Sequence, residues 1–136
     1  IKWLEEKEQK VDHVCCLYAT APFVFTKDLQ DGFQKITTLN IDYAFSVAEY
    51  PSSIQRALKI NPHNRVEMLY PEHFLSRSQD LEKRYFDAGQ FYWGKASSWL
   101  NKSNIFTSRS VPIVIPIYRV QDIDEEHHSH HHKIKQ

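Results

Sequence analysis

The order of three patterned segments near the N-terminus constrains the fold more than any other feature of the sequence. Residues 11–19, VDHVCCLYA, form a nearly continuous apolar run, which is typical of a strand buried on both faces. Residues 26–39 place apolar side chains at helical spacing after Thr26, a candidate N-cap, and residues 42–50, DYAFSVAEY, form a second apolar run. Strand, helix and strand in this order predict a βαβ unit, and therefore an α/β fold with a mostly parallel sheet and flanking helices.

The middle of the chain predicts a departure from this pattern. The segments IQRALKI (54–60) and RVEMLY (65–70) flank the turn-rich NPHN, which indicates a β-hairpin. Residues 71–86 are charged and carry few apolar anchors, so we expect a helix or an excursion from the core there. Beyond it, residues 87–94 are predicted to form a short aromatic strand and residues 95–101 a short helix.

Composition narrows the class of protein. At 136 residues the chain fits one domain, and its 17 Lys and Arg balance its 17 Asp and Glu, so charge favours neither a nucleic-acid nor a membrane partner. No apolar run approaches the roughly 20 residues that span a bilayer, and the N-terminus lacks the profile of a signal peptide. The adjacent Cys15 and Cys16 are poorly placed to pair with each other, so we expect buried free thiols and a cytoplasmic protein.

Two aspartates close the last apolar run. Residues 111–124, VPIVIPIYRVQDID, predict a strand ending in Asp122 and Asp124, whose carboxylates would share one face because they are two residues apart. Paired carboxylates at the carboxyl end of a strand suit a hard cation such as Mg²⁺, bound together with substrate phosphates. The alternative is a solvated acidic turn, since the Asp-x-Asp pattern is short and common.

A histidine-rich tail, residues 125–136, follows the aspartates. Five of the eight histidines lie between His127 and His132, in a polar segment. Such a tail can bind Zn²⁺ or Ni²⁺ without a closed geometry, and a disordered tail is the alternative that we expect. The three glycines of the chain lie too far apart to form a Gly-rich phosphate loop within these residues.

Four stretches together resemble one family. VCCLYATAPF, DYAFSVAEYPSSIQRAL, SRSQDLEKRYFDAGQFYWG and RSVPIVIPIYRVQDID occur in the order found in the acylneuraminate cytidylyltransferases, with the greatest likeness to members that activate pseudaminic acid. The resemblance covers residues 1–124, as the C-terminal part of a single cytidylyltransferase domain with a Rossmann-like fold. It implies transfer of CMP from CTP to the anomeric hydroxyl of a nonulosonic acid, of the pseudaminic or sialic type, with release of pyrophosphate.

The resemblance also implies roles for individual residues. Asp122 and Asp124 match the family's aspartate pair, which binds Mg²⁺, so they are the implied catalytic and metal-binding residues. Tyr18 stands where the sialic-acid enzymes carry a glutamine, and this departure favours pseudaminic acid. For the aromatic residues implied to bind substrate, ordinary core packing is the alternative. The full set of substrate-binding residues that the resemblance implies is Tyr18, Thr20, Arg77, Gln90, Tyr92 and Phe106.

The resemblance further implies assembly, and it has limits. Residues 54–84 match the position of the family's dimerisation excursion, so we expect a homodimer; a surface decoration on a monomer is the alternative. The family's N-terminal strand and CTP loop have no counterpart in these residues, so we expect a fragment with little turnover on its own. Rival interpretations are a non-catalytic sugar-binding or oligomerisation module derived from the family and, more weakly, a metal-binding protein that uses its histidine tail.

Overall fold

The chain forms two compact units. The computed structural model describes residues 1–19 and 24–120. One unit, here the sheet unit, contains residues 1–48 and the described residues from Asp87 onward. The other, here the hairpin unit, contains residues 49–86 and includes the predicted excursion.

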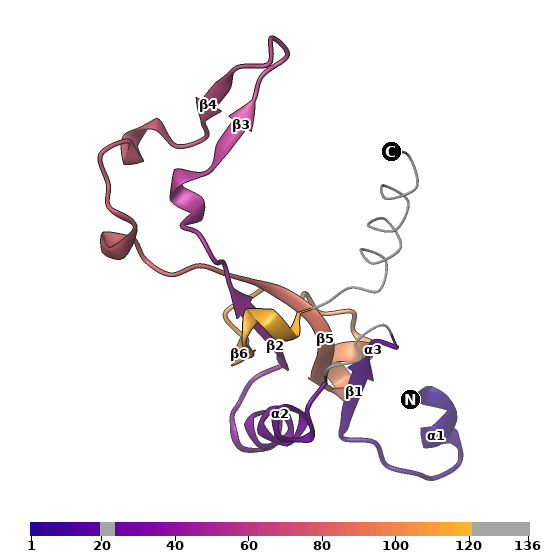
Figure 1. The fold of residues 1–136 in the computed structure, drawn as a ribbon. Coiled ribbons are helices and arrows are strands. Elements are labelled where there is room, and N and C mark those ends of the chain that lie inside the picture. Colours follow the sequence, from indigo (N-terminus) through magenta and orange to yellow (C-terminus); the bar gives the residue numbers. More distant parts are fainter. Residues whose placement is uncertain (20–23, 121–136) are drawn as a thin grey trace, which may run out of the picture. The chain divides into compact units, whose positions relative to one another are not determined.

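A mixed sheet of four strands forms the centre of the sheet unit. β1 pairs with β5 in antiparallel orientation, whereas β2 pairs with β6 in parallel orientation. The α/β class is therefore confirmed, but the prediction of a mostly parallel sheet is wrong, and the architecture is Rossmann-like only in a loose sense. The spatial order is β1-β5-β2-β6 (Figure 1), and the strands are β1 (His13–Leu17), β2 (Tyr43–Glu49), β5 (Tyr85–Lys95) and β6 (Ser110–Val114).

The position of β1 explains this difference. β1 lies at an edge of the sheet and its neighbour is β5, so β1 and β2 do not pair with each other. The prediction that residues 11–19 are buried on both faces is wrong, because Leu17 is 53% exposed. Cys15 and Cys16 are free thiols as expected, but Cys16 is exposed and Cys15 only half-buried. An apolar run does not reveal its partner strand when that partner comes much later in the chain.

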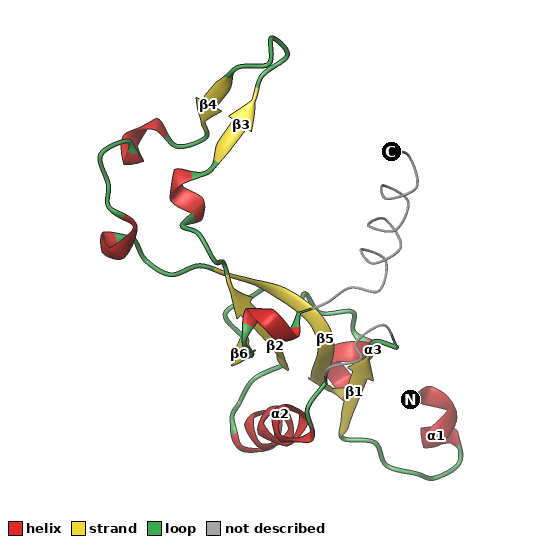
Figure 2. Cartoon of the chain, in the orientation of Figure 1, coloured by secondary structure: helices red, strands yellow, loops and turns green. Residues whose placement is uncertain are grey.

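The helices of the sheet unit agree with the predicted ones. Two of them correspond to the helices expected over residues 26–39 and 95–101. The first of these begins after Phe25 as N-cap, with no side-chain cap, so Thr26 does not have the expected role. No helix in the described ranges is long and apolar enough to cross a membrane. The three helices (Figure 2) are α1 (Lys2–Glu6), α2 (Thr26–Thr38) and α3 (Ala96–Leu100).

Alternation along β5 separates two faces of the sheet. Trp93 turns toward α2, where its Nε1 donates a hydrogen bond to the Leu29 carbonyl oxygen at 2.9 Å. The next residue, Gly94, faces α3, since a Cβ added there would lie 2.4 Å from Nε1 of Trp99. The α2 face buries a cluster of Ile36, Ile41 and Ala44, and the α3 face buries a cluster of Phe45, Val47 and Tyr92.

The last strand is shorter than predicted. β6 ends at Val114, and a 3-10 helix, η4 (Ile117–Arg119), follows Pro116. The prediction of one strand over residues 111–124 is therefore wrong over residues 115–120, and residues 121–124 lie outside the described part of the chain. Proline has no backbone N–H and fixes its own φ, which explains why the apolar run changes structure at this position. Asp122 and Asp124 lie outside the described residues.

The hairpin unit contains the predicted hairpin. β3 (Leu58–Ile60) and β4 (Val66–Met68) pair in antiparallel orientation, as expected from the NPHN turn between them (Figure 2). The side-chain oxygen of Asn61 accepts hydrogen bonds from the backbone N–H groups of His63 and Arg65 at 3.0 and 2.9 Å, which closes the turn. The rest of the unit carries short 3-10 helices: η1 (Ile54–Arg56), η2 (Pro71–His73) and η3 (Ser78–Asp80).

Candidate functional site

An aromatic cavity of about 280 Å³ lies on the α3 side of the sheet unit. Three of the residues implied to bind substrate, Tyr18, Tyr92 and Phe106, line it together although they are far apart in the sequence. Of the lining residues that the structure describes, Asp87 is the only Asp, Glu, Lys, Arg or His. The complete lining is Cys16, Tyr18, Asp87, Tyr92, Trp99, Asn104, Ile105 and Phe106.

Strand register brings the first of these residues together. Cys16 pairs with Tyr92 across the β1–β5 ladder, and Tyr18 follows two residues later, on the same face of the chain. The Tyr18 backbone N–H donates to the Gln90 carbonyl oxygen at 3.1 Å, which extends the pairing beyond β1. The edge strand therefore supplies one wall of the cavity.

Contacts between aromatic rings shape the interior. Tyr92 is 6% exposed; its ring stacks on Phe45 with centroids 5.7 Å apart and meets Tyr18 edge-on at 5.4 Å. Phe106 meets Phe45 edge-on at 5.8 Å, yet it remains 68% exposed. Tyr92 is thus part of the core, whereas Phe106 and Tyr18, which is 47% exposed, present ring surface to a ligand.

A hydrogen-bonded pair supplies the polar group of the cavity. The Tyr92 hydroxyl donates to the Asp87 carboxylate, with its oxygen 2.7 and 2.6 Å from the two carboxylate oxygens. The backbone N–H of Gly89 donates to the same carboxylate at 2.9 Å, from a residue with φ +67° that glycine adopts without strain. Burial raises the pKa of the Tyr92 hydroxyl far above its ordinary value, and the Asp87 carboxylate raises that pKa further. Tyr92 is therefore a neutral donor.

Gln90, another implied substrate residue, does not line this cavity. Its side chain is 3% exposed, and its Nε2 donates to the Arg119 carbonyl oxygen at 2.8 Å. Within the described part of the chain, its Oε1 has no hydrogen-bond partner. Gln90 therefore holds the backbone at the end of η4.

A buried ion pair holds the same segment from its other side. Nη1 of Arg119 lies 2.5 Å from Oδ2 of Asp28, in the first turn of α2, and the two side chains are 12% and 10% exposed. The guanidinium carbon also lies 4.0 Å from the centroid of the Phe25 ring. This pair joins α2 to Arg119, which precedes Asp122 by three residues in the sequence.

Replacing Asp28 by alanine is expected to lower the free energy of unfolding by about 3 kcal/mol, because a buried Arg119 charge would lose its partner. The matched control is Asp42→Ala, which removes the more exposed partner of Arg109, whose Nε lies 3.2 Å away. That change should cost less than about 1 kcal/mol. Urea denaturation of both variants checks the difference, and equal losses would contradict the role of burial.

The other implied residues lie elsewhere. Arg77 belongs to the hairpin unit, where its Nε contacts the Asp80 carboxylate at 3.0 Å on an exposed surface. Thr20, Asp122 and Asp124 lie outside the described residues, so their implied roles stay predictions. Among the residues that the structure places, no group of three or more His, Cys, Asp or Glu could hold a metal ion.

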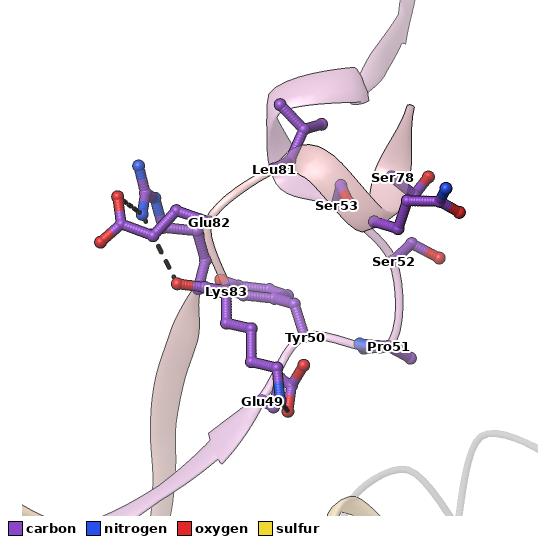
Figure 3. Close-up of a pocket in the computed structure, with 11 residues that line it drawn as sticks. Glu49, Tyr50, Pro51, Ser52, Ser53, Ser78, Leu81, Glu82 and Lys83 are labelled. Atoms are coloured by element: carbon purple, nitrogen blue, oxygen red, sulfur yellow. Dashed lines mark hydrogen bonds and ion pairs between the residues drawn. The ribbon is translucent and has the colours of Figure 1, made fainter. Parts of the chain in front are cut away.

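A second cavity, of about 430 Å³, lies within the hairpin unit and is lined by residues 49–53, 78, 79 and 81–84 (Figure 3). Its charged groups are already paired. Lys83 Nζ lies 3.7 Å from a Glu49 carboxylate oxygen, and Arg84 Nη1 lies 2.8 Å from a Glu82 carboxylate oxygen. This cavity contains no implied substrate residue, so the aromatic cavity is the stronger candidate site.

Sequence reasoning missed the residues that complete the aromatic cavity: Cys16, Asp87, Trp99, Asn104 and Ile105. The two-residue spacing of Cys16 and Tyr18 was an available signal. Asp87 is the first residue of DAGQFYWG, residues 87–94. The alternation of side chains along a strand would predict which face Asp87 points to, but it is interrupted at Gly89, where φ is +67°. For Asn104, whose side chain accepts the Phe106 N–H at 2.9 Å, no sequence signal pointed to the site.

Comparison with known proteins identifies relatives. No protein-family model matches the chain. Pseudaminic acid cytidylyltransferases of two Campylobacter jejuni strains, serotypes O:23/36 and O:2, are each 42% identical over 124 residues, which is 91% of this chain and 53% of the relative. A Helicobacter pylori protein named pseudaminic acid cytidylyltransferase and UDP-2,4-diacetamido-2,4,6-trideoxy-β-L-altropyranose hydrolase is 34% identical over 122 residues, 88% of this chain and 23% of the relative.

These matches confirm the resemblance recognised in the motifs. The chain spans about half the length of the Campylobacter relatives that it matches, 53% in each case. The matches to these relatives cover 91% of this chain at 42% identity. This chain is therefore a homologue of part of the pseudaminic acid cytidylyltransferases.

Proposed function

We propose that the chain takes part in the transfer of CMP from CTP to the anomeric hydroxyl of a nonulosonic acid, with release of pyrophosphate. One observation supports this most directly: Tyr18, Tyr92 and Phe106, each implied by motif to bind sugar, line a single cavity. The relatives named pseudaminic acid cytidylyltransferase favour pseudaminic acid as the substrate. In this proposal the aromatic cavity holds the sugar acid.

The chemistry of the cavity suits part of a modified sugar. Exposed ring surface on Phe106 and Tyr18 can contact methyl groups and C–H faces, while Asp87 accepts hydrogen bonds. The Helicobacter relative's name joins a cytidylyltransferase to a hydrolase of a diacetamido trideoxy sugar. A sugar acid that retains such groups offers both methyl groups and N–H donors to this cavity.

We further propose that Asp122 and Asp124 bind Mg²⁺. The described residues offer no alternative cluster of ligands, so this assignment depends on the motif alone. When bound, the ion would neutralise charge on the α-phosphate and the leaving pyrophosphate. Arg77 could hold a carboxylate with its planar guanidinium, and Thr20 and Gln90 remain proposed substrate contacts.

The proposal extends to assembly and location. We propose that residues 54–84 mediate a homodimer, because the hairpin unit exposes an unusual amount of apolar surface. We also place the reaction in the cytoplasm, where free thiols such as Cys15 and Cys16 stay reduced.

Replacing Phe106 by alanine is expected to weaken binding of pseudaminic acid roughly tenfold, because the sugar loses a ring that covers it. The fold should persist, since Phe106 is 68% exposed. Trp3→Ala is the matched control, because Trp3 is 65% exposed and lines no part of the cavity. Isothermal titration of both variants is the measurement, and equal affinities would argue against this cavity as the sugar site.

A further inference from the structure

The charge of the aromatic cavity restricts which end of a sugar acid can enter it. Among the described residues that line the cavity, Asp87 is the one Asp, Glu, Lys, Arg or His side chain, and its charge is negative. A carboxylate or a phosphate brought next to Asp87 would be repelled, with no cation in the lining to compensate. The carboxylate of the ligand must therefore face away from this cavity.

The hydrogen-bonding state of Asp87 shows what it can accept. Its carboxylate accepts hydrogen bonds from the Tyr92 hydroxyl and the Gly89 N–H. A carboxylate has about four lone-pair sites, so some of them remain free to accept a hydrogen bond from a ligand. Both donors come from β5, so the carboxylate is held in place before any ligand arrives. Tyr92 is a neutral, buried hydroxyl that donates its proton to Asp87, so it occupies one of these acceptor sites and leaves the others.

The apolar part of the cavity lies beside this acceptor. Ile105 and Phe106 line it together with Asp87, and Trp99 completes the apolar lining. An acetamido group matches such a pair of surfaces, since it presents an N–H donor next to a methyl group. A hydroxyl alone would satisfy the acceptor but leave the apolar surface uncovered.

We infer that Asp87 is a specificity-determining residue that accepts the N–H of a substrate acetamido group, while the methyl of that group packs on the Ile105 and Phe106 surface. This inference rests on the proposed function. It orients the sugar acid with an acetamido end in the cavity and its carboxylate and anomeric hydroxyl outside. Asp87 thereby selects acylamino sugars over analogues without the N–H.

The experiment compares two ligands on three proteins by isothermal titration. The ligands are pseudaminic acid and an analogue with acetoxy groups in place of both acetamido groups, which keeps each carbonyl and methyl but removes each N–H. The proteins are the wild-type chain, Asp87→Asn, and Asp12→Asn, which changes an exposed aspartate outside the cavity. Asparagine keeps an oxygen that can accept from Tyr92, and thermal denaturation reports whether the fold is retained.

Wild type and Asp12→Asn are expected to prefer the acetamido ligand by at least tenfold, because the ester oxygen would face a carboxylate. Asp87→Asn should reduce that preference to about threefold or less, mainly through weaker acetamido binding. A preference unchanged in Asp87→Asn, or equal losses for both ligands, would overturn the role of Asp87 while leaving the proposed function intact. Absence of pseudaminic acid binding to wild type would overturn both.

A second measurement locates the bound ligand. Cys16 is exposed and lines the cavity. The pKa of the Cys15 thiol is raised, first by burial and then by the neighbouring Cys16, so Cys15 should react more slowly. In a Cys15→Ser background, pseudaminic acid should slow alkylation of Cys16 by iodoacetamide several-fold. Binding without this protection would contradict the inference, because the ligand would then lie elsewhere.

Discussion

Replacing Phe74 and Leu75 together by glutamate is expected to dissociate the proposed homodimer into monomers at micromolar concentration. These side chains are 68% and 86% exposed in the hairpin unit. Burying both against a second copy would contribute roughly 3 kcal/mol or more, and two carboxylates in their place would oppose association, so the dimer dissociation constant should rise more than 100-fold. Sedimentation equilibrium measures this constant directly. Further large hydrophobic side chains of the same unit that are at least 44% exposed are Leu58, Ile60, Val66, Leu69, Tyr70 and Tyr85.

The matched control adds the same charge to a polar part of the unit. His63→Glu with Asn64→Asp places two carboxylates in the turn of the hairpin, where aspartate tolerates the positive φ of Asn64. This variant should stay dimeric. Dissociation of both variants would indicate a general charge effect, and a wild-type chain that is monomeric at all concentrations would contradict the proposed dimer.

Local patterns in the sequence predicted the elements well, because each pattern depends on neighbouring residues. The apolar spacing in residues 26–39 and the turn signals around NPHN correspond to α2 and to the β3–β4 hairpin. Pairing between strands was not predictable in the same way. β1, α2 and β2 follow one another in the sequence as they would in a βαβ unit. The strand that pairs with β1 is nevertheless β5, most of which comes after the hairpin unit. The sequence of residues 13–17 does not indicate which strand will pair with β1.

The end of β6 was predictable in principle. Pro116 interrupts the apolar run, and a proline inside a strand pattern argues against continuing the strand. The composition stays apolar up to Tyr118, which is why the pattern predicts a strand that continues past this proline. The argument that two carboxylates point from one face of a strand therefore has no support in the described structure, and the proposed metal site depends on the family motif.

The candidate site was predictable in part, for a similar reason. Motif positions identified Tyr18, Tyr92 and Phe106, which the fold brings to one cavity. They did not identify Asp87, whose relevance comes from its contact with Tyr92, nor the ion pair between Asp28 and Arg119. The ion pair joins side chains that are far apart in the sequence, and the contact between Asp87 and Tyr92 joins two residues of β5 on either side of Gly89, where φ is +67°. Contacts of that kind require coordinates.

Replacing Asp122 by alanine is expected to remove the dependence of CTP binding on Mg²⁺. With both aspartates present, magnesium should increase the affinity for CTP, because Asp122 and Asp124 would hold the ion and its charge would offset that of the phosphates. Loss of one carboxylate should lower the affinity measured in Mg²⁺ about 100-fold and leave the weaker affinity measured in EDTA unchanged. Isothermal titration of CTP in Mg²⁺ and in EDTA gives both values.

Two controls make the result specific to the pair of aspartates. Glu125→Ala removes the adjacent negative charge but leaves Asp122 and Asp124, so it should retain the response to Mg²⁺. Deleting residues 127–136 removes five histidines, and it should also retain that response, because imidazole is a poor ligand for magnesium. A response lost with the tail would favour the metal-binding alternative. If the unaltered chain dimerises but its binding of CTP does not depend on Mg²⁺, the result would instead favour a non-catalytic module. The surface of the hairpin unit can act in assembly whether or not the aspartates bind a metal.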